Sequence, residues 1–326
     1  MKFCSKATIV FIANCMLGIM LSAPSTMAQT RDQGPWWPHP EWGPDDQAGS
    51  SNRITPEKIL EAVSLVRTGK VYELGHVYER DMPLGRNRSY AMFMPGMPTG
   101  GPFGNHGLVY NDEFLCAEIG QVGTQFDGPG HIGKPMSMDD GSSIDVYYNG
   151  FTSDEMESPY GLRKLGVEHV KPFITRGILI DVAGYKGVET LPNDYVITMA
   201  DVRGALTRQG IGDADIRVGD ALLFNFGWWR LWPDAKRFNS NWPGIGKDVA
   251  EWVLERKVSM VGSDAATDED EDAVHHDLLL LRGILNLEFM TFDTLLADDV
   301  DEFLFVFTPL RLKGATGSPG RPLAIR

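Results

Sequence analysis

Residues 121–131 read Gln-Val-Gly-Thr-Gln-Phe-Asp-Gly-Pro-Gly-His and combine amide, carboxylate and imidazole groups with turn-forming residues. If the first seven of them form a strand, its two-residue period places Gln121, Gln125 and Asp127 on one face. The Gly-Pro-Gly that follows does not continue a strand, so we expect a turn that folds His131 back over that face. The segment therefore predicts one wall of a metal site, with an ordinary surface turn as the alternative.

A second informative stretch is residues 275–289, His-His-Asp-Leu-Leu-Leu-Leu-Arg-Gly-Ile-Leu-Asn-Leu-Glu-Phe. The pattern predicts a short apolar helix that stops at Gly283, followed by a strand. In that strand the apolar residues, Phe289 included, would face a core, and Asn286 and Glu288 would face the other way. Because burying an unpaired carboxylate is costly, Glu288 needs a partner, and a cation is suitable. An exposed Glu288 on an edge strand is the alternative.

Together the two segments resemble the cyclase family of metal-dependent hydrolases, which includes bacterial kynurenine formamidase and isatin hydrolase. The family pattern is His-x-Gly-Thr-His-x-Asp-x-Pro-x-His, and here Gln121 and Gln125 stand at its first two histidines while the other positions match. Farther along, the family has a histidine, a Leu-Leu pair, a glycine and a glutamate, which His276 and Glu288 fit. The likeness continues at residues 42–49, 74–76, 219–223, 242–244, 261–264 and 309–322. The glutamine version of the motif is similar to a longer subgroup of that family.

The resemblance implies that Asp127, His276 and Glu288 are metal ligands and that His131 transfers protons. Glutamines in the two histidine positions would coordinate through carbonyl oxygens, which are neutral and harder donors than imidazole nitrogen. The loss of two nitrogen ligands disfavours a pair of zinc ions and favours a single ion with mostly oxygen ligands. We therefore expect one divalent ion, with Mn²⁺ as the first candidate and Zn²⁺ and Mg²⁺ as alternatives.

These ligands predict a hydrolase. A divalent ion makes bound water acidic enough to lose a proton near neutral pH, so the activated water would attack a carbonyl carbon while His131 accepts and returns the proton. The expected substrates are small cyclic or aryl amides, lactams or lactones. Two alternatives stay open, namely a metal-dependent lyase or cyclase that moves a proton without attack by water, and a non-catalytic binding protein on the same fold.

Three further residues are candidates to bind the substrate. Residues 88–111 are rich in Met, Pro and Gly and predict a long loop before the metal strand, in which His106 would contact the substrate. A flexible surface excursion is the alternative for this segment. Trp228 and Trp229 follow a predicted buried strand at residues 221–226, and in the resembling family this stretch borders the pocket. Either ring would then stack on a flat substrate, with a core role as the alternative.

The first residues of the chain predict export. Lys2 and Lys6 precede an apolar stretch at residues 7–21, and Thr-Met-Ala at residues 26–28 is typical of a cleavage site, so we expect residues 1–28 to be a signal peptide. The mature protein would then be secreted or periplasmic and not membrane-bound. The alternative, an uncleaved anchor, is disfavoured because the apolar stretch is shorter than the roughly 20 residues that span a bilayer.

The rest of the chain divides into an N-terminal arm rich in Trp and Pro, residues 29–51, and a catalytic domain, residues 52–326. Burial of Trp36, Trp37 and Trp42 against the body or a second subunit is expected, because exposed tryptophans are unfavourable, and the arm suggests a homo-oligomer. Cys116, the one cysteine outside the signal peptide, is expected to be buried beside the metal strand.

Composition and charge bound the fold and the partners. With 43% hydrophobic residues the chain can build a substantial core. The resemblance implies a single α/β domain whose mixed sheet curls like a barrel, with helices outside. The formal net charge of −14 repels polyanions, which excludes nucleic acid and leaves a small-molecule substrate as the expected partner. The sequence has no Gly-rich phosphate loop after a strand and no Gly-x-Ser-x-Gly elbow, which argues against nucleotide chemistry and serine hydrolysis.

Overall fold

The computed structural model describes residues 34–85, 87–137, 141–268 and 272–326. The predicted signal peptide, the start of the predicted N-terminal arm at residues 29–33 and the acidic residues 269–271 lie outside the described residues. Within the described ranges, no helix combines the length and the apolar character that a membrane span requires.

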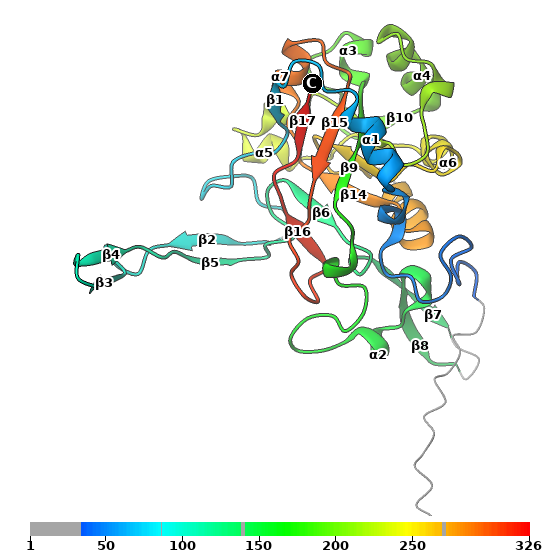
Figure 1. Cartoon of the computed structure of the whole chain (residues 1–326). Helices are drawn as coiled ribbons and strands as arrows, with labels where there is room; N and C mark the ends of the chain where they lie inside the picture. Colours follow the sequence, from blue (N-terminus) through cyan, green and yellow to red (C-terminus); the bar gives the residue numbers. More distant parts are fainter. Residues whose placement is uncertain (1–33, 86, 138–140, 269–271) are drawn as a thin grey trace, which may run out of the picture. The chain divides into compact units, whose positions relative to one another are not determined.

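A nine-stranded mixed sheet forms the centre of the fold (Figure 1). In sheet order its strands are β1 (Val71–Glu73), β17 (Leu323–Ile325), β15 (Glu302–Phe307), β9 (Phe173–Asp181), β11 (Ala221–Asn225), β13 (Met260–Ser263), β14 (Leu285–Glu288), β6 (Gln125–Asp127) and β16 (Gly317–Pro319). The four central strands β9, β11, β13 and β14 run parallel to one another, and every strand outside them is antiparallel to its neighbours in the sheet. The sheet curves into an open half-barrel, which confirms the predicted fold class.

Short helices cover the sheet. They are α1 (Pro56–Val63), α2 (Ser153–Met156), α3 (Val182–Lys186), α4 (Met199–Arg208), α5 (Ala235–Phe238), α6 (Lys247–Arg256), α7 (Asp293–Ala297) and the π-helix η6 (Ala273–Leu280). Single 3₁₀ turns are η1 (Gly49–Arg53), η2 (Tyr148–Gly150), η3 (Val167–His169), η4 (Asp213–Asp215) and η5 (Trp228–Leu231). Their starts follow local sequence rules. Thr55 accepts a hydrogen bond from the Lys58 amide and Pro56 opens α1, while Thr198 and Asp201 form a capping box at α4.

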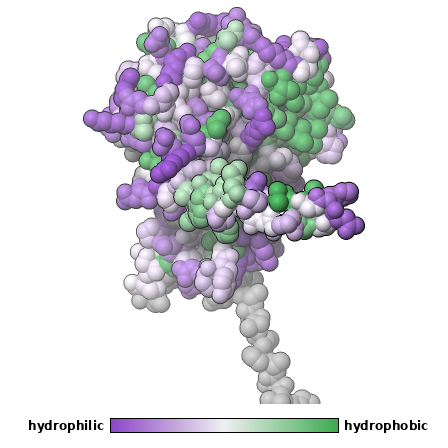
Figure 2. Space-filling view, turned by 90° about the vertical axis from the view of Figure 1, so that its left-hand side faces the viewer, coloured by the Kyte–Doolittle hydropathy of each residue, from purple (hydrophilic) through white to green (hydrophobic). Residues whose placement is uncertain are grey.

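The segment expected to be a long loop is instead built from strands, so that prediction is wrong. Strands β2 (Tyr90–Phe93) and β5 (Phe114–Ala117) pair antiparallel, and β3 (Gly100–Phe103) pairs with β4 (Leu108–Tyr110) beyond them. We call residues 90–117 the hairpin arm. It projects from the body of the molecule (Figure 1) and points toward the viewer in Figure 2. The expected burial of Cys116 is also wrong, because it lies on β5 and is exposed.

Two further strand pairs complete the fold. β7 (Gly133–Ser137) pairs antiparallel with β8 (Ser143–Tyr147), and β10 (Val196–Ile197) pairs parallel with β12 (Gly244–Ile245). The N-terminal segment packs on this body, which is one of the two positions expected for it; the other was a second subunit. Trp36 is buried and its indole Nε1 donates to the Tyr147 carbonyl at 3.4 Å. Trp42 stacks on His39 with ring centroids 4.1 Å apart.

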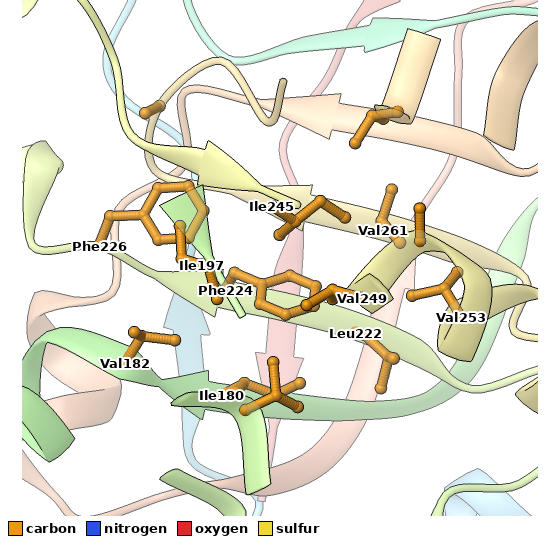
Figure 3. Packing of buried hydrophobic residues seen from close by; sticks show 14 of the residues in the cluster. Ile180, Val182, Ile197, Leu222, Phe224, Phe226, Ile245, Val249, Val253 and Val261 are labelled. Carbon is orange, nitrogen blue, oxygen red and sulfur yellow. The ribbon is translucent and has the colours of Figure 1, made fainter. Parts of the chain in front are cut away.

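The core lies on both faces of the parallel strands. Ile180 and Leu222, from β9 and β11, gather with Val249 and Val253 of α6 on one face (Figure 3). The neighbouring Leu223, with residues such as Leu179, belongs to a second buried cluster. Because successive side chains of a strand point to opposite faces, both faces of these strands are buried, as is usual for parallel sheets. A sheet held in this way is a rigid base for the side chains at its ends.

Candidate metal centre

Strand pairing brings the two predicted segments together. β6 runs antiparallel to β14, with Gln125 opposite Glu288 and Asp127 opposite Asn286. These four side chains therefore share one face of the sheet, while the residues between them are buried in the core on the other face. The predicted faces of both strands thus agree with the structure. Strand β6 is shorter than expected, since it begins only at Gln125.

Residues 121–124 bend instead of extending, and Gly123 has the positive φ of +62° that favours glycine. The bend still brings Gln121 into the group, because its Nε2 donates to Asp127 Oδ1 at 2.8 Å. Gln125 Nε2 donates to Glu288 Oε2 at 2.9 Å. Asn286 Nδ2 lies 3.2 Å from Asp127 Oδ2 and 3.0 Å from Glu288 Oε1. Three amide groups thus hold two buried carboxylates side by side.

Two histidines complete the cluster. The turn after β6 forms as predicted, with the His131 amide bonded to the Gly128 carbonyl at 3.0 Å. It brings His131 Nε2 to 3.6 Å from Asp127 Oδ1. From η6, His275 Nε2 lies 3.4 Å from Asp127 Oδ2 and 3.8 Å from Glu288 Oε1. Asp127, His131 and His275 each offer one ligand atom, and these three atoms lie within 4.8 Å of one another.

The predicted ligand His276 lies beside this cluster. Its Nδ1 is 2.7 Å from Asp277 Oδ1, and its Nε2 is 3.2 Å from Lys134 Nζ. The structure therefore turns the ring of His275, and not that of His276, toward Asp127 and Glu288. The physical reason is the π-helix, whose wider turn changes the direction of each side chain relative to an α-helix. Spacing along the sequence cannot reveal that change.

The electrostatics of the cluster are those of buried, closely packed charges. Burial and the negative charge of Asp127 raise the pKa of Glu288 to about 7. Burial also acts to raise the pKa of Asp127, but the charge of His131 and the hydrogen bond from His275 outweigh it and hold this pKa below the usual carboxyl range. Burial lowers the pKa of His275, but hydrogen bonds with Asp127 and Asp268 outweigh burial and raise this pKa well above that of a free imidazole.

The glutamines supply a direct test of whether a cation fits. Gln121 Oε1 and Gln125 Oε1 are buried and have no hydrogen-bond partner, although the nitrogen of each amide is bonded to a carboxylate. A buried polar atom without a partner costs roughly 1–3 kcal/mol. A divalent cation among these side chains would satisfy both oxygens and balance the two carboxylates. The residues present therefore fit a single, mostly oxygen-coordinated metal ion.

The cluster lies on the wall of a cavity of about 660 Å³, a size suited to a small molecule. The lining includes the rings of Trp242 and Phe289, whose centroids are 5.8 Å apart. Phe289 was expected to face the core, but its backbone φ of +56° ends the strand pattern and only part of its side chain is buried. Arg88 and Lys134 bring positive charge to the same cavity.

None of the three predicted substrate contacts lines this cavity. His106 is exposed on the hairpin arm. Trp228 is 1% exposed and its Nε1 donates to the Phe238 carbonyl at 3.0 Å, so it has the core role that was the alternative. Trp229 packs under the guanidinium of Arg230, 4.2 Å from its ring centroid. Trp242 and Phe289 take the aromatic positions instead, and in the sequence only the place of Phe289 next to Glu288 could have indicated this.

Comparisons with known proteins show the family and the fold of this chain. Residues 72–269 match the Cyclase family model, so the chain belongs to the cyclase family of metal-dependent hydrolases. The structure of a novel cyclase, 29% identical, covers 87% of this chain and 96% of its own with a TM-score of 0.75. None of the curated proteins matches this chain.

Two isatin hydrolases share the fold. Isatin hydrolase A from Ralstonia solanacearum is 20% identical over 84% of this chain and 99% of its own, with a TM-score of 0.56. Isatin hydrolase A from Labrenzia aggregata, solved with benzyl benzoate bound, is 19% identical over 81% and 94%, also with a TM-score of 0.56. Family membership together with the buried cluster supports an enzyme; its substrate is a separate question.

Proposed function

We propose that this chain is a hydrolase that uses one divalent ion, with Mn²⁺ as the first candidate, to cleave a small cyclic or aryl amide, lactam or lactone. The observation that carries the proposal is the pair of partnerless glutamine oxygens beside two buried carboxylates. The proposed ligands are Gln121, Gln125, Asp127, His275 and Glu288. Membership of a family of metal-dependent hydrolases supports the same function.

The chemistry divides between the ion and the chain. When bound, a divalent ion would lower the pKa of water from about 16 toward neutrality and polarise a substrate carbonyl. His131 is placed to accept a proton from the attacking water, because it lines the cavity and its Nε2 lies 3.6 Å from Asp127 Oδ1. The water oxygen then bonds to the acyl carbon, the bond from that carbon to the leaving nitrogen or oxygen breaks, and His131 returns the proton to the leaving atom.

The aromatic lining would select and position the substrate. Trp242 and Phe289 present flat, apolar surfaces on the cavity that also contains Glu288. A planar ring can stack there with its carbonyl directed at the carboxylate cluster. These features favour a cyclic or aryl substrate over a flexible, fully polar one.

Product analysis in ¹⁸O-labelled water tests the proposal. The protein, loaded with Mn²⁺, is screened against aryl amides, lactams and lactones, and one ¹⁸O atom is expected in each carboxylic acid formed. Turnover without label in the product would identify a lyase or cyclase instead. Retention of one metal ion per chain without turnover of any class would favour the binding protein. Either result would overturn the proposed hydrolysis.

Metal uptake is expected to depend on pH. His275 and Glu288 both have a raised pKa in the metal-free protein, so each holds a proton at lower pH and must release it before it can coordinate an ion. The apparent affinity should therefore fall as the pH falls, by about tenfold per pH unit for each proton released, between about pH 8 and pH 6. Titration calorimetry in buffers of different ionisation enthalpy counts the protons. A pH-independent affinity over this range would contradict the ligand set.

A further inference from the structure

Asp268 lines the cavity but has no part in the chemistry proposed above. Its side chain is only 15% exposed, and both of its carboxylate oxygens face the start of η6. Oδ1 accepts a hydrogen bond from the Val274 amide at 2.5 Å, and the His275 amide lies 3.2 Å from each oxygen. Oδ2 contacts Nδ1 of the His275 ring. One carboxylate thus holds both the backbone and the ring of His275, which fixes the direction of that ring.

The contact with Asp268 also determines which nitrogen of His275 is available to an ion. An ionised carboxylate only accepts hydrogen bonds, so the ring nitrogen that faces it, Nδ1, carries a hydrogen. In a neutral ring the other nitrogen, Nε2, then has the free lone pair. Nε2 lies 3.4 Å from Asp127 Oδ2 and 3.8 Å from Glu288 Oε1, so the lone pair is beside the two buried carboxylates. A histidine that binds a metal ion needs this arrangement.

The neighbouring His276 has different partners. Its Nδ1 lies 2.7 Å from Asp277 Oδ1, and its Nε2 lies 3.2 Å from Lys134 Nζ. A lysine ammonium group only donates, so Nε2 of His276 accepts that hydrogen bond and its lone pair is already used. Of the two adjacent rings, only that of His275 therefore presents a free nitrogen to the carboxylate cluster.

The segment that carries Asp268 is anchored to the rest of the fold. Asp268 forms a parallel bridge with Ile245, whose amide donates to the Thr267 carbonyl at 3.1 Å. Thr267 is fully buried, and its Oγ1 donates to Asn286 Oδ1 at 2.9 Å. Because the oxygen of Asn286 accepts this bond, its nitrogen is the atom that faces the two carboxylates. Two consecutive residues, Thr267 and Asp268, thus orient one amide and one imidazole of the centre.

We propose that Asp268 is a positioning residue of the metal centre: it directs Nε2 of His275 at the buried carboxylates and thereby makes His275, and not His276, the ligand. Residues that orient a ligand in this way contribute about ten- to a hundredfold to metal affinity. The inference rests on the proposed function, because it concerns the ion that the hydrolase would use. Metal binding tests it without any measurement of turnover.

Asp268→Asn separates the orientation of the ring from the support of the helix. Asparagine satisfies the first amides of a helix as well as aspartate does, so the metal-free variant should unfold at a temperature close to that of the wild type. It has one acceptor oxygen in place of two. With that oxygen on the backbone amides, its NH₂ group faces Nδ1 of His275 and moves the ring hydrogen to Nε2, which blocks coordination. The dissociation constant for Mn²⁺, measured by competition with a fluorescent chelator, should therefore rise about ten- to a hundredfold.

The matched control is Asp272→Asn. Asp272 lies at the same end of η6 and lines the same cavity, but it is exposed and its side chain makes no capping hydrogen bond. Its φ of +50° is one that asparagine adopts readily. The variant removes the same charge near the site, and because solvent screens an exposed charge, the affinity should change by no more than about threefold.

A double-mutant cycle shows whether Asp268 acts through His275. In His275→Ala there is no ring to orient, so the addition of Asp268→Asn should weaken the affinity by no more than about threefold. The wild-type protein provides a measurement that needs no variant. Long-range ¹H–¹⁵N spectra of the protein loaded with diamagnetic Zn²⁺ should show the His275 ring with its hydrogen on Nδ1 and the ion on Nε2.

Three results would overturn the inference and leave the proposed hydrolysis standing: wild-type affinity in Asp268→Asn, the same loss of affinity with and without the His275 ring, or coordination of the ion through Nδ1 of His275. Affinities that follow the expected pattern without turnover of any substrate would contradict the hydrolysis alone. A wild-type protein that binds no divalent ion would overturn both.

Discussion

We expect Asp127→Asn to reduce bound Mn²⁺ to background and turnover by about a thousandfold or more. Asp127 is fully buried and lies within contact distance of Gln121, His131, His275 and Asn286, so it is the residue on which the cluster converges. Asparagine keeps the shape and loses the charge. Because a catalytic ion contributes several kcal/mol to a hydrolytic reaction, its loss corresponds to about three powers of ten in rate.

The matched control for this variant is Asp194→Asn. Asp194 lines the same cavity but belongs to a different segment, and its φ of +57° is one that asparagine adopts readily. It should keep one ion per chain and most of the activity. Metal content by elemental analysis and thermal unfolding in the presence of chelator separate loss of the ion from loss of the fold. Full metal occupancy in Asp127→Asn would show that the ion binds without Asp127, which would contradict the proposed centre.

The fold could be predicted where local chemistry and period agree. Alternation in residues 284–289 separated Leu285 and Leu287, which face the core, from Asn286 and Glu288, which face the site. The Gly-Pro-Gly after Asp127 predicted the turn that carries His131. The half-barrel itself followed from the family resemblance, since no single segment shows which strands pair. The pairing of β6 with β14 joins residues about 160 positions apart, and only packing of the whole chain determines it.

The hairpin arm could not be predicted because it lacks the usual pattern of a strand. Met92 and Phe93 are both apolar and both exposed, so the segment does not alternate between a buried and a solvated face. Proline and glycine between its short strands indicate turns more strongly than strands. The prediction that Cys116 is buried was wrong because it rested only on its position in sequence next to the predicted metal strand.

The site residues, too, could be predicted only where a local sequence pattern determines which way a side chain points. Asp127, Gln125 and Glu288 lie on strands whose faces are read directly from sequence, and the structure brings them together. The aromatic wall depends on tertiary packing, which buries Trp228 in the core and leaves Trp242 at the cavity. Which of the two helix histidines faces the cluster depends on the π-helix η6, and no pattern in the sequence predicts that helix. Sequence therefore predicted the strand side of the centre better than its helix side.

The adjacent histidines give the sharpest test of that helix side. We expect His275→Ala to weaken Mn²⁺ binding by at least about a hundredfold, because even partners of ligands contribute ten- to a hundredfold to metal affinity. His276→Ala should change the affinity by no more than about threefold, since its ring contacts Asp277 and Lys134 instead. The two variants remove the same group from neighbouring positions of one helix, so each is the control for the other.

Competition with a fluorescent chelator measures both affinities, and thermal unfolding of the metal-free proteins shows whether each variant folds. The pH dependence adds a second criterion, because His275 carries a proton that the ion must displace whereas removal of His276 leaves the number of released protons unchanged. If His276→Ala lost the ion and His275→Ala kept it, the ligand implied by family spacing would be correct. The bound ion would then have to rotate both rings from the positions seen in the structure, at the cost of the contacts between His275 and Asp268.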